Sequence, residues 1–457
     1  MRVALVHPHL FHHPAPSLPS GLAWLGAALR ARGHHVRLLD LSFVWNRSSA
    51  IPGFVTAFRP DVVALGVPYL DNECAFHALS FLPATRWVAD ALRAASRAPI
   101  VAGGWGVTWA PSDVLRYLGL SLGFVGGDLA RASEWIEAVG HGDLDADVPG
   151  AARWDGAAYR ATPPDSDPAG LAADPAAAAH DLLDLTRHEA HGGSAVVAVA
   201  LPRGAAMRRR EPAEVDHEVG VLRTISTARR VLFAGWCVGR EGLIDDALLE
   251  RLAMRGPTLA WEMYAEPEAV TRERLGVARR AGVRALRLEV GDGAELDGPA
   301  LALAQTPRDL AVLLEVRIGG PRETPGSLAR KLATLRNLRH GPTRIVLRPG
   351  ARLWEPASGE VLERRSGAAG DSYVWPRFGF AELLEGTLRE SLTDVATDRA
   401  GTSLDSDAYA PWQRFAHAFG RRSGIWPAWR LDSHLADLGK HLRGALIERV
   451  PFRNQPR

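Results

Sequence analysis

Cysteine is nearly absent from this sequence of 457 residues, in which Cys74 and Cys237 are the only two. Two thiols cannot build the disulfide framework of a small secreted protein, and such scarcity is typical of chains kept in a reducing compartment. Nor can they supply the three or four thiolates that hold an iron–sulfur cluster. We therefore expect a cytoplasmic protein without iron–sulfur ligands.

Long apolar runs and an excess of one charge are also missing. No stretch reaches the ~18 apolar residues of a membrane-spanning helix, and the N-terminus lacks the pattern of a secretory signal peptide. Lysine and arginine total 54 against 52 aspartates and glutamates, which gives a net charge of +2. The sequence therefore predicts no membrane and no nucleic-acid partner. The basic segment 207–210 is interpreted as a solvated surface patch rather than a phosphate site.

Residues 1–140 alternate short runs of Val, Leu and Ile with amphipathic helical segments. This alternation is typical of a parallel sheet covered by helices on both faces, which binds ligands beyond the carboxyl ends of its strands. The expected strands are 3–8, 35–41, 61–68, 99–104 and 122–127. The loops that follow the first, third, fourth and fifth of them are therefore the candidate ligand-binding loops.

A second α/β unit is expected after residues 141–190, a segment rich in Ala, Asp, Pro and Gly that is interpreted as an extended linker. Six strand–helix repeats follow, and repeats of this kind curl into a parallel barrel that six units leave open. Their strands are expected at 194–201, 229–235, 258–266, 285–290, 311–319 and 344–350. Residues 361–457 are interpreted as mostly helical, with aromatic side chains that either clamp an apolar substrate or pack the helices.

Both units resemble the cobalamin-binding radical S-adenosylmethionine (SAM) family, in its class B methyltransferase-like branch. In the first unit the resemblance rests on PSLPSGLAWLGAALRARGHHVRLLDL (16–41) and VAGGWGVT (101–108). In the second it rests on TRERLGVARRAGVRALRLEVGDG (271–293) and GGPRETPGSL (319–328). Where the family carries CxxxCxxC, this chain reads PRGAAMRRREP (202–212). The chain is thus identified as a degenerate member that lacks the [4Fe–4S] motif.

The resemblance implies four regions: a Rossmann-like cobalamin-binding domain (1–140), a linker (141–190), a partial (β/α)6 barrel (191–360) and a helical region covering the substrate (361–457). It also implies a set of cofactor-binding residues at the ends of strands. These are His9, Pro19, Ser20, Gly21, Pro68, Tyr69, Gly103, Gly104, Trp105, Gly126, Gly127, Trp236, Gly320 and Glu323.

Two further groups of side chains are candidates for chemistry. His12 is a candidate axial ligand of cobalt, because imidazole binds this metal, although the loop lacks the Asp-x-His-x-x-Gly motif and could simply be solvated. Polar residues at the carboxyl ends of barrel strands are candidate catalytic residues, or else part of a structural salt-bridge network. These are Tyr264, Glu266, Glu289 and Arg317.

The resemblance implies a cobalamin-dependent enzyme of specialised, natural-product metabolism that works without an iron–sulfur cluster. Non-radical methyl transfer through methylcobalamin, with SAM as the candidate methyl donor, is the reaction that we expect. Two alternatives stay open: a cobalamin-dependent cyclisation or rearrangement without cleavage of SAM, and a non-catalytic pseudoenzyme or cobalamin carrier. The expected partners are a small-molecule or peptide substrate and either a reductase or an intact radical SAM protein.

Overall fold

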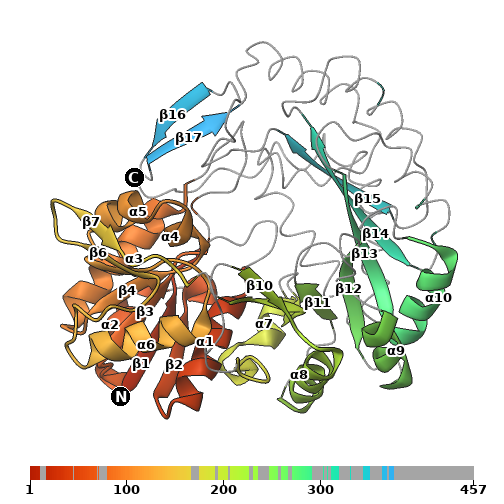
Figure 1. Cartoon of the computed structure of the whole chain (residues 1–457), viewed down its shortest axis with the longest axis horizontal. Helices are drawn as coiled ribbons and strands as arrows, with labels where there is room; N and C mark the ends of the chain where they lie inside the picture. Colours follow the sequence, from red (N-terminus) through yellow and green to blue (C-terminus); the bar gives the residue numbers. More distant parts are fainter. Residues whose placement is uncertain are drawn as a thin grey trace.

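The computed structural model places two large β-sheets side by side, the first mainly parallel and the second wholly parallel, each with its own helices (Figure 1). No helix in the part of the chain described here is long and apolar enough to cross a membrane. The residues that the structure describes are 1–10, 17–44, 46–68, 70, 80–165, 174–190, 194–203, 206–225, 230–234, 246–255, 259–265, 270–290, 302, 306, 310–318, 330, 343–349, 363–367 and 370–374.

The first sheet has the strand order β2-β1-β3-β4-β5-β6-β7, and its first five strands are parallel. They are β1 (Arg2–His7), β2 (His35–Asp40), β3 (Val62–Gly66), β4 (Ile100–Gly103) and β5 (Leu122–Phe124). Four of them lie within the strands predicted from the apolar runs, and β1 begins one residue before the predicted strand 3–8. Since β1 pairs with both β2 and β3, the strand order changes direction at β1. The carboxyl ends of β1 and β3 therefore frame a crevice.

Helices cover both faces of this sheet, as predicted. The alternating side chains of β1 show it: Val3 and Leu5 pack on one face, and Ala4 and Val6 on the other. The first face carries α1 (Ser20–Ala31) and α6 (Leu129–Gly140). The opposite face carries α2 (Arg47–Phe58), α3 (Leu82–Ala95) and α5 (Pro111–Leu118), and the short α4 (Trp105–Trp109) follows β4.

The segment 141–190 is more structured than the extended linker that we expected. Its strands β6 (Ala151–Trp154) and β7 (Tyr159–Ala161) form an antiparallel hairpin that extends the first sheet beyond β5. The Asp155 carboxylate closes the turn by accepting hydrogen bonds from the amides of Ala157 and Ala158. Strands of three or four residues are too short to show periodicity, which explains why the pattern did not reveal them.

The second sheet has the order β15-β14-β13-β12-β11-β8, and every neighbouring pair is parallel. Its strands are β8 (Ala195–Ala198), β11 (Arg230–Ala234), β12 (Ala260–Ala265), β13 (Val283–Val290), β14 (Ala311–Ile318) and β15 (Thr343–Pro349). The six predicted barrel strands are therefore present. Helices α8 (Pro212–Ile225), α9 (Asp246–Arg255) and α10 (Arg272–Ala281) pack on one face of this sheet.

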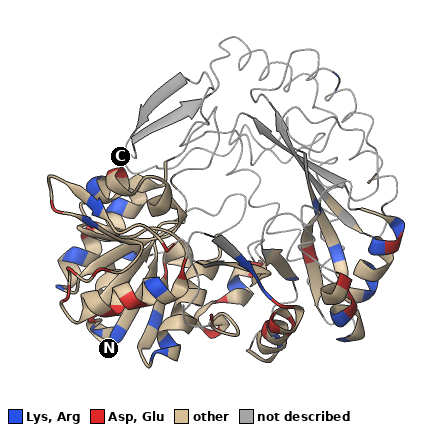
Figure 2. Ribbon diagram, in the orientation of Figure 1, with Lys and Arg blue, Asp and Glu red and all other residues tan. Residues whose placement is uncertain are grey.

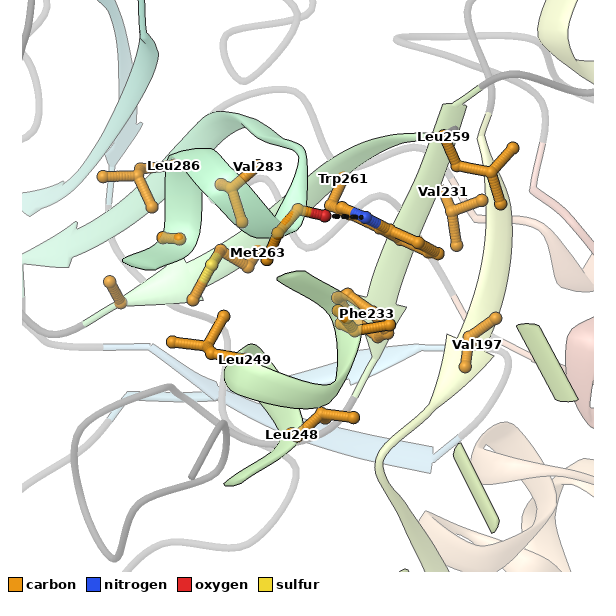
Figure 3. Close-up of a cluster of buried hydrophobic side chains, with 14 of the residues drawn as sticks. Val197, Val231, Phe233, Leu248, Leu249, Leu259, Trp261, Met263, Val283 and Leu286 are labelled. Atoms are coloured by element: carbon orange, nitrogen blue, oxygen red, sulfur yellow. Dashed lines mark hydrogen bonds between the residues drawn. The ribbon is translucent and has the colours of Figure 1, made fainter. Parts of the chain in front are cut away.

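An apolar core joins these helices to the sheet (Figure 3). At its centre Phe233 stacks on Trp261 with 4.8 Å between ring centroids. The indole Nε1 of Trp261 donates a hydrogen bond of 2.8 Å to the carbonyl of Ala281, so its one polar atom is satisfied.

Two short elements lie between the two sheets in the sequence, η2 (His180–Leu182) and α7 (Leu185–Ala190). The antiparallel hairpin of β9 (Ala200–Arg203) and β10 (Ala206–Arg209) follows β8. The 3-10 turn η1 (Leu41–Phe43) follows β2. Of the C-terminal region, the structure describes only the antiparallel pair β16 (Glu363–Gly367) and β17 (Gly370–Val374). The helices expected there lie outside the described residues.

Candidate cofactor site

A cavity of about 470 Å³ opens at the carboxyl edge of the first sheet, in the crevice between β1 and β3. Its volume falls in the range of small-molecule sites, roughly 300–1,000 Å³. Its lining comes from the ends of β1, β3, β4 and β5, from α1 and α6, and from the first strands of the second unit. This is the position at which doubly wound sheets bind their ligands.

The inner part of the cavity is apolar. Ala64, Val101 and Phe124 contribute side chains from three strands, and Ala132 and Ile136 face them from α6. These five residues are all buried. The inner cavity therefore favours an apolar group of the ligand, because it offers few hydrogen-bond partners.

The rim of the cavity is built from backbone, because glycines follow β4 and β5. Gly104 has φ +107°, and a Cβ atom there would lie 2.8 Å from the Val67 carbonyl oxygen, so the turn excludes any side chain. Gly126 has φ +97° for the same kind of turn after β5. Next to Gly104, the indole of Trp105 is 51% exposed at the rim. A ligand can thus approach the backbone closely and meet an aromatic ring.

The second unit closes one side of the cavity. Val196 and Ala198 of β8 and Leu201 of β9 belong to its lining. Ala198 and Leu201 also pack with Trp24 of α1 in one buried cluster. The cavity wall is therefore shared, and its shape depends on how β8 and β9 are held against α1.

His7, the last residue of β1, is a buried residue of the cavity lining. Its Nε2 lies 3.0 Å from the Ser17 carbonyl oxygen, and because a carbonyl only accepts, Nε2 carries the proton. Burial, partly opposed by the negative charge of Asp40, lowers the pKa of His7 from 6.5 to about 4. The ring is neutral at pH 7, and this bond fixes the returning loop at Ser17.

Asp40 connects this site to α7. Its carboxylate accepts hydrogen bonds from His188 Nε2 at 2.9 Å and from the Ser42 amide at 2.9 Å. Burial alone would raise the pKa of Asp40, but these bonds and the charges of His188 and His7 bring it below its usual value. The ring of Phe43 meets His188 edge-on at 4.7 Å between centroids. A buried pair thus ties β2 to the segment that leads into the second sheet.

The structure brings most of the described cofactor-binding candidates together. Those that line the cavity are Pro19, Ser20, Gly21, Pro68, Gly103, Gly104, Trp105, Gly126 and Gly127. His9 does not: its buried ring packs edge-on against Phe81 at 5.0 Å and stands 5.8 Å from the ring of His7. Tyr69, Trp236, Gly320, Glu323 and the candidate cobalt ligand His12 lie outside the described residues.

The structure describes two of the histidines near the first loop, His7 and His9. Nε2 of His7 is committed to the Ser17 carbonyl, and His9 lies away from the cavity lining. Within the described part of the chain, no group of three or more His, Cys, Asp or Glu could hold a metal ion.

A second polar cluster lies on the opposite face of the barrel sheet from its helices. Glu262 of β12, 2% exposed, accepts a hydrogen bond of 2.8 Å from Arg287 Nε of β13. Arg287 Nη1 in turn lies 3.4 Å from the hydroxyl of Tyr264, and Ser194 Oγ lies 3.4 Å from the other carboxylate oxygen of Glu262. Burial would raise the pKa of Glu262, but the charges of Arg287 and Arg230 outweigh it, so the pKa lies below its usual value.

This cluster contains one of the four candidate catalytic residues, Tyr264. Glu289 pairs with Glu315 in the β13–β14 register and Arg317 pairs with Arg348 in the β14–β15 register, whereas Glu266 lies outside the described residues. Sequence reasoning missed Glu262. Its signal was its position two residues before Tyr264, which places both side chains on one face of the strand.

The cavity predicts the effect of adding a side chain at Gly103. A Cβ atom there would meet only Phe124, at 3.9 Å, so valine fits the strand and its methyl groups occupy cavity space. We expect Gly103→Val to weaken ligand binding by about tenfold or more, with little change in melting temperature. Gly53→Val on α2, where a Cβ meets nothing within 4 Å, is the matched control. Equal affinity of the two variants would contradict the assignment of the cavity.

Comparison with known proteins gives this fold a context. No protein-family model matches the sequence. A tryptophan 2-C-methyltransferase from Streptomyces laurentii is 32% identical over 139 residues, which cover 28% of this chain and 22% of the relative. The alignment therefore spans about a fifth of that relative's length.

Solved structures align over far more of the chain. The radical SAM methyltransferase TsrM from Kitasatospora setae, with tryptophan and a SAM analogue bound, superposes with a TM-score of 0.75 at 17% identity. That alignment covers 96% of this chain and 99% of TsrM. The cobalamin-dependent SAM radical enzyme OxsB, with aqua-cobalamin and SAM bound, gives 0.62 at 13% identity, covering 99% of this chain and 76% of OxsB. The chain has the fold of cobalamin-dependent radical SAM enzymes. The resemblance expected from the sequence is thus confirmed in the fold.

Proposed function

We propose that this chain is a cobalamin-dependent methyltransferase of specialised metabolism that works without an iron–sulfur cluster. The observation that carries the proposal is the cavity at the carboxyl edge of the first sheet, with its glycine rim and apolar interior. The fold shared with TsrM and OxsB, both solved with cobalamin bound, supports it.

The residues of the cavity fit part of a cobalamin molecule. The glycine turns at Gly104 and Gly126 leave the space above the strand ends free of side chains. Trp105 and Trp24 supply aromatic surface, and the inner cavity accepts an apolar group. Neutral His7 holds Ser17 and with it the loop that lines the entrance. Bound cobalamin supplies a cobalt centre that can carry a methyl group.

An iron–sulfur cluster does not fit the residues of this sequence. TsrM has been solved with a [4Fe–4S] cluster as well as cobalamin. Cys74 and Cys237 are the only cysteines here, and neither lies near residues 202–212, where the family motif would stand. Since three thiolates are needed, we propose a two-electron methyl transfer with SAM as the donor.

The barrel cluster is the proposed place for the substrate. Tyr264 lies at the carboxyl end of β12, the edge at which barrel enzymes carry their active sites. Arg287 donates toward its hydroxyl oxygen, which holds the phenol at this edge of the sheet. We assign Tyr264 to substrate binding and Glu262 and Arg287 to its positioning.

A visible absorption spectrum tests the proposal. The protein is reconstituted with hydroxocobalamin, freed of excess by gel filtration, and then given SAM under a strong reductant. Retained corrin bands that convert to those of methylcobalamin are the expected result. Retained corrin without a response to SAM would instead support the cyclisation or the carrier role, and loss of all corrin would overturn the assignment of the cavity.

A further inference from the structure

The segment that would carry the cluster cysteines is an ordered hairpin followed by a buried arginine. Strands β9 and β10 pair from Ala200 to Arg209, and Arg210 follows with only 3% of its surface exposed. Figure 2 shows the basic end of β10 between the two units of the fold. The expectation that residues 207–210 form a solvated patch is therefore wrong for Arg210, because its side chain is buried among acceptors of its own chain.

The Arg210 guanidinium contacts two residues of the cavity wall from behind. Its Nη1 donates to the Ala198 carbonyl at 2.7 Å, and its Cζ lies 4.8 Å from the centroid of the Trp24 ring. Ala198 belongs to β8 and Trp24 to α1, and both line the cavity. One side chain thus joins the two units at the wall that they share.

The two terminal amino groups of Arg210, Nη1 and Nη2, also hold the segments on either side. Nη2 donates to the carbonyls of Ala176 at 2.8 Å and Glu214 at 3.1 Å. Nη1 also forms an ion pair with Glu218, whose other carboxylate oxygen lies 2.8 Å from His180 Nε2. The side chains of Arg210, Glu218 and His180 are all at most 1% exposed. Only a planar cation with several fixed donors can satisfy these acceptors together.

Arg208 completes the arrangement in the same segment. Its Nε lies 2.9 Å from Asp174, and its Nη1 lies 3.0 Å from Glu214. Fixed guanidinium groups thus occupy this part of the chain, where the family motif would provide thiolates. The segment is adapted to bind carboxylates and carbonyls of its own chain rather than a metal cluster.

We propose that Arg210 is a positioning residue that fixes the shared wall of the cofactor cavity in place of a metal cluster. The inference rests on the proposed function, in which that cavity takes cobalamin. Arg210 does not contact the ligand in this arrangement; it holds Ala198 and Trp24, which line the cavity.

Affinity for hydroxocobalamin, titrated by absorption, tests the role of Arg210. We expect Arg210→Met to bind about tenfold or more weakly and Arg210→Lys to fall between it and the unaltered protein. Arg255→Met is the matched control, because it breaks a partly exposed pair with Asp216 on α8 and should change the affinity by less than about twofold. Binding by Arg210→Met as tight as that of the unaltered protein would overturn the proposal.

A double variant separates positioning from neutralisation of a buried charge. Arg210→Met with Glu218→Leu replaces the ion pair by apolar side chains and should recover the part of the melting temperature that Arg210→Met loses to the unpaired charge of Glu218. If Arg210 positions the wall through carbonyls, the affinity for cobalamin stays low in this folded variant. Recovery of both stability and affinity would show that Arg210 only neutralises Glu218, and the proposal would fail.

Hydrogen exchange keeps the inference distinguishable from the proposed function. Arg210→Met should lose amide protection in β8 and around residues 176–180, whether or not cobalamin binds. If the unaltered protein binds no cobalamin, the proposed function fails, and unchanged exchange in the variant would overturn the positioning role separately.

Anaerobic reconstitution with iron and sulfide should leave no more iron than on a control protein without a metal site. Assembly of a cluster would overturn the replacement.

Discussion

Glu262→Gln is expected to lower the free energy of unfolding by about 3–5 kcal/mol, the usual loss when one partner of a buried ion pair is removed. Glu262 is 2% exposed and accepts a hydrogen bond from Arg287, and the charge of Arg230 also acts on it. A glutamine keeps the volume of the side chain but removes the negative charge that Arg287 and Arg230 face. Urea unfolding followed by circular dichroism measures the loss.

An exposed ion pair in the same unit provides the control. Arg274 and Asp246 lie 3.3 Å apart with side chains 39% and 67% exposed. Asp246→Asn should therefore change the free energy of unfolding by less than about 1 kcal/mol. If Glu262→Gln is no more destabilising than this control, water reaches the cluster, and the structural importance that we assign to it is wrong.

The same cluster holds Tyr264 in the way that the proposed substrate site requires. Glu262 orients Arg287, and Arg287 approaches the hydroxyl of Tyr264 near the carboxyl end of β12. Each bond fixes the next side chain, so the phenol has a defined position before any substrate arrives. Preorganised polar groups of this kind are what a two-electron reaction requires of its protein.

The sequence predicted the strands well because buried parallel strands are continuous apolar runs. The run 61–68 contains β3 and the run 311–319 contains β14, although the two belong to different sheets. Glycines after β4 and β5 predicted the cavity rim for a similar local reason, since a turn such as that at Gly104 requires a residue without a side chain.

Features that depend on distant partners could not be predicted in this way. Arg210 ends the segment MRRR (207–210), which in the sequence looks like an exposed basic patch. Its acceptors, however, belong to Ala176, Ala198 and Glu218. The burial of His7 likewise depends on the chain returning at Ser17. Local pattern carries no information about such contacts, because only the folded chain brings the partners together.

Acidification from pH 7 to pH 4 is expected to destabilise the protein by about 3 kcal/mol through His7 alone. Burial and the charge of His188 lower its pKa to about 4, although Asp40 opposes them, whereas the unfolded chain titrates near 6.5. Between these values the unfolded state binds more protons, so the free energy of unfolding falls as the pH falls. Above pH 6.5 both states are neutral, and His7 adds no pH dependence.

His7→Gln isolates this contribution from the carboxylates that also titrate below pH 5. The amide of glutamine can donate to the Ser17 carbonyl as His7 Nε2 does, but it does not titrate. We would measure urea unfolding of both proteins between pH 7 and pH 4. The free energy of unfolding of the unaltered protein, relative to that of His7→Gln, should fall steadily as the pH falls. Parallel curves would mean that His7 takes up a proton as readily in the folded protein as in the unfolded chain, so that the cavity would carry a positive charge below about pH 6.5.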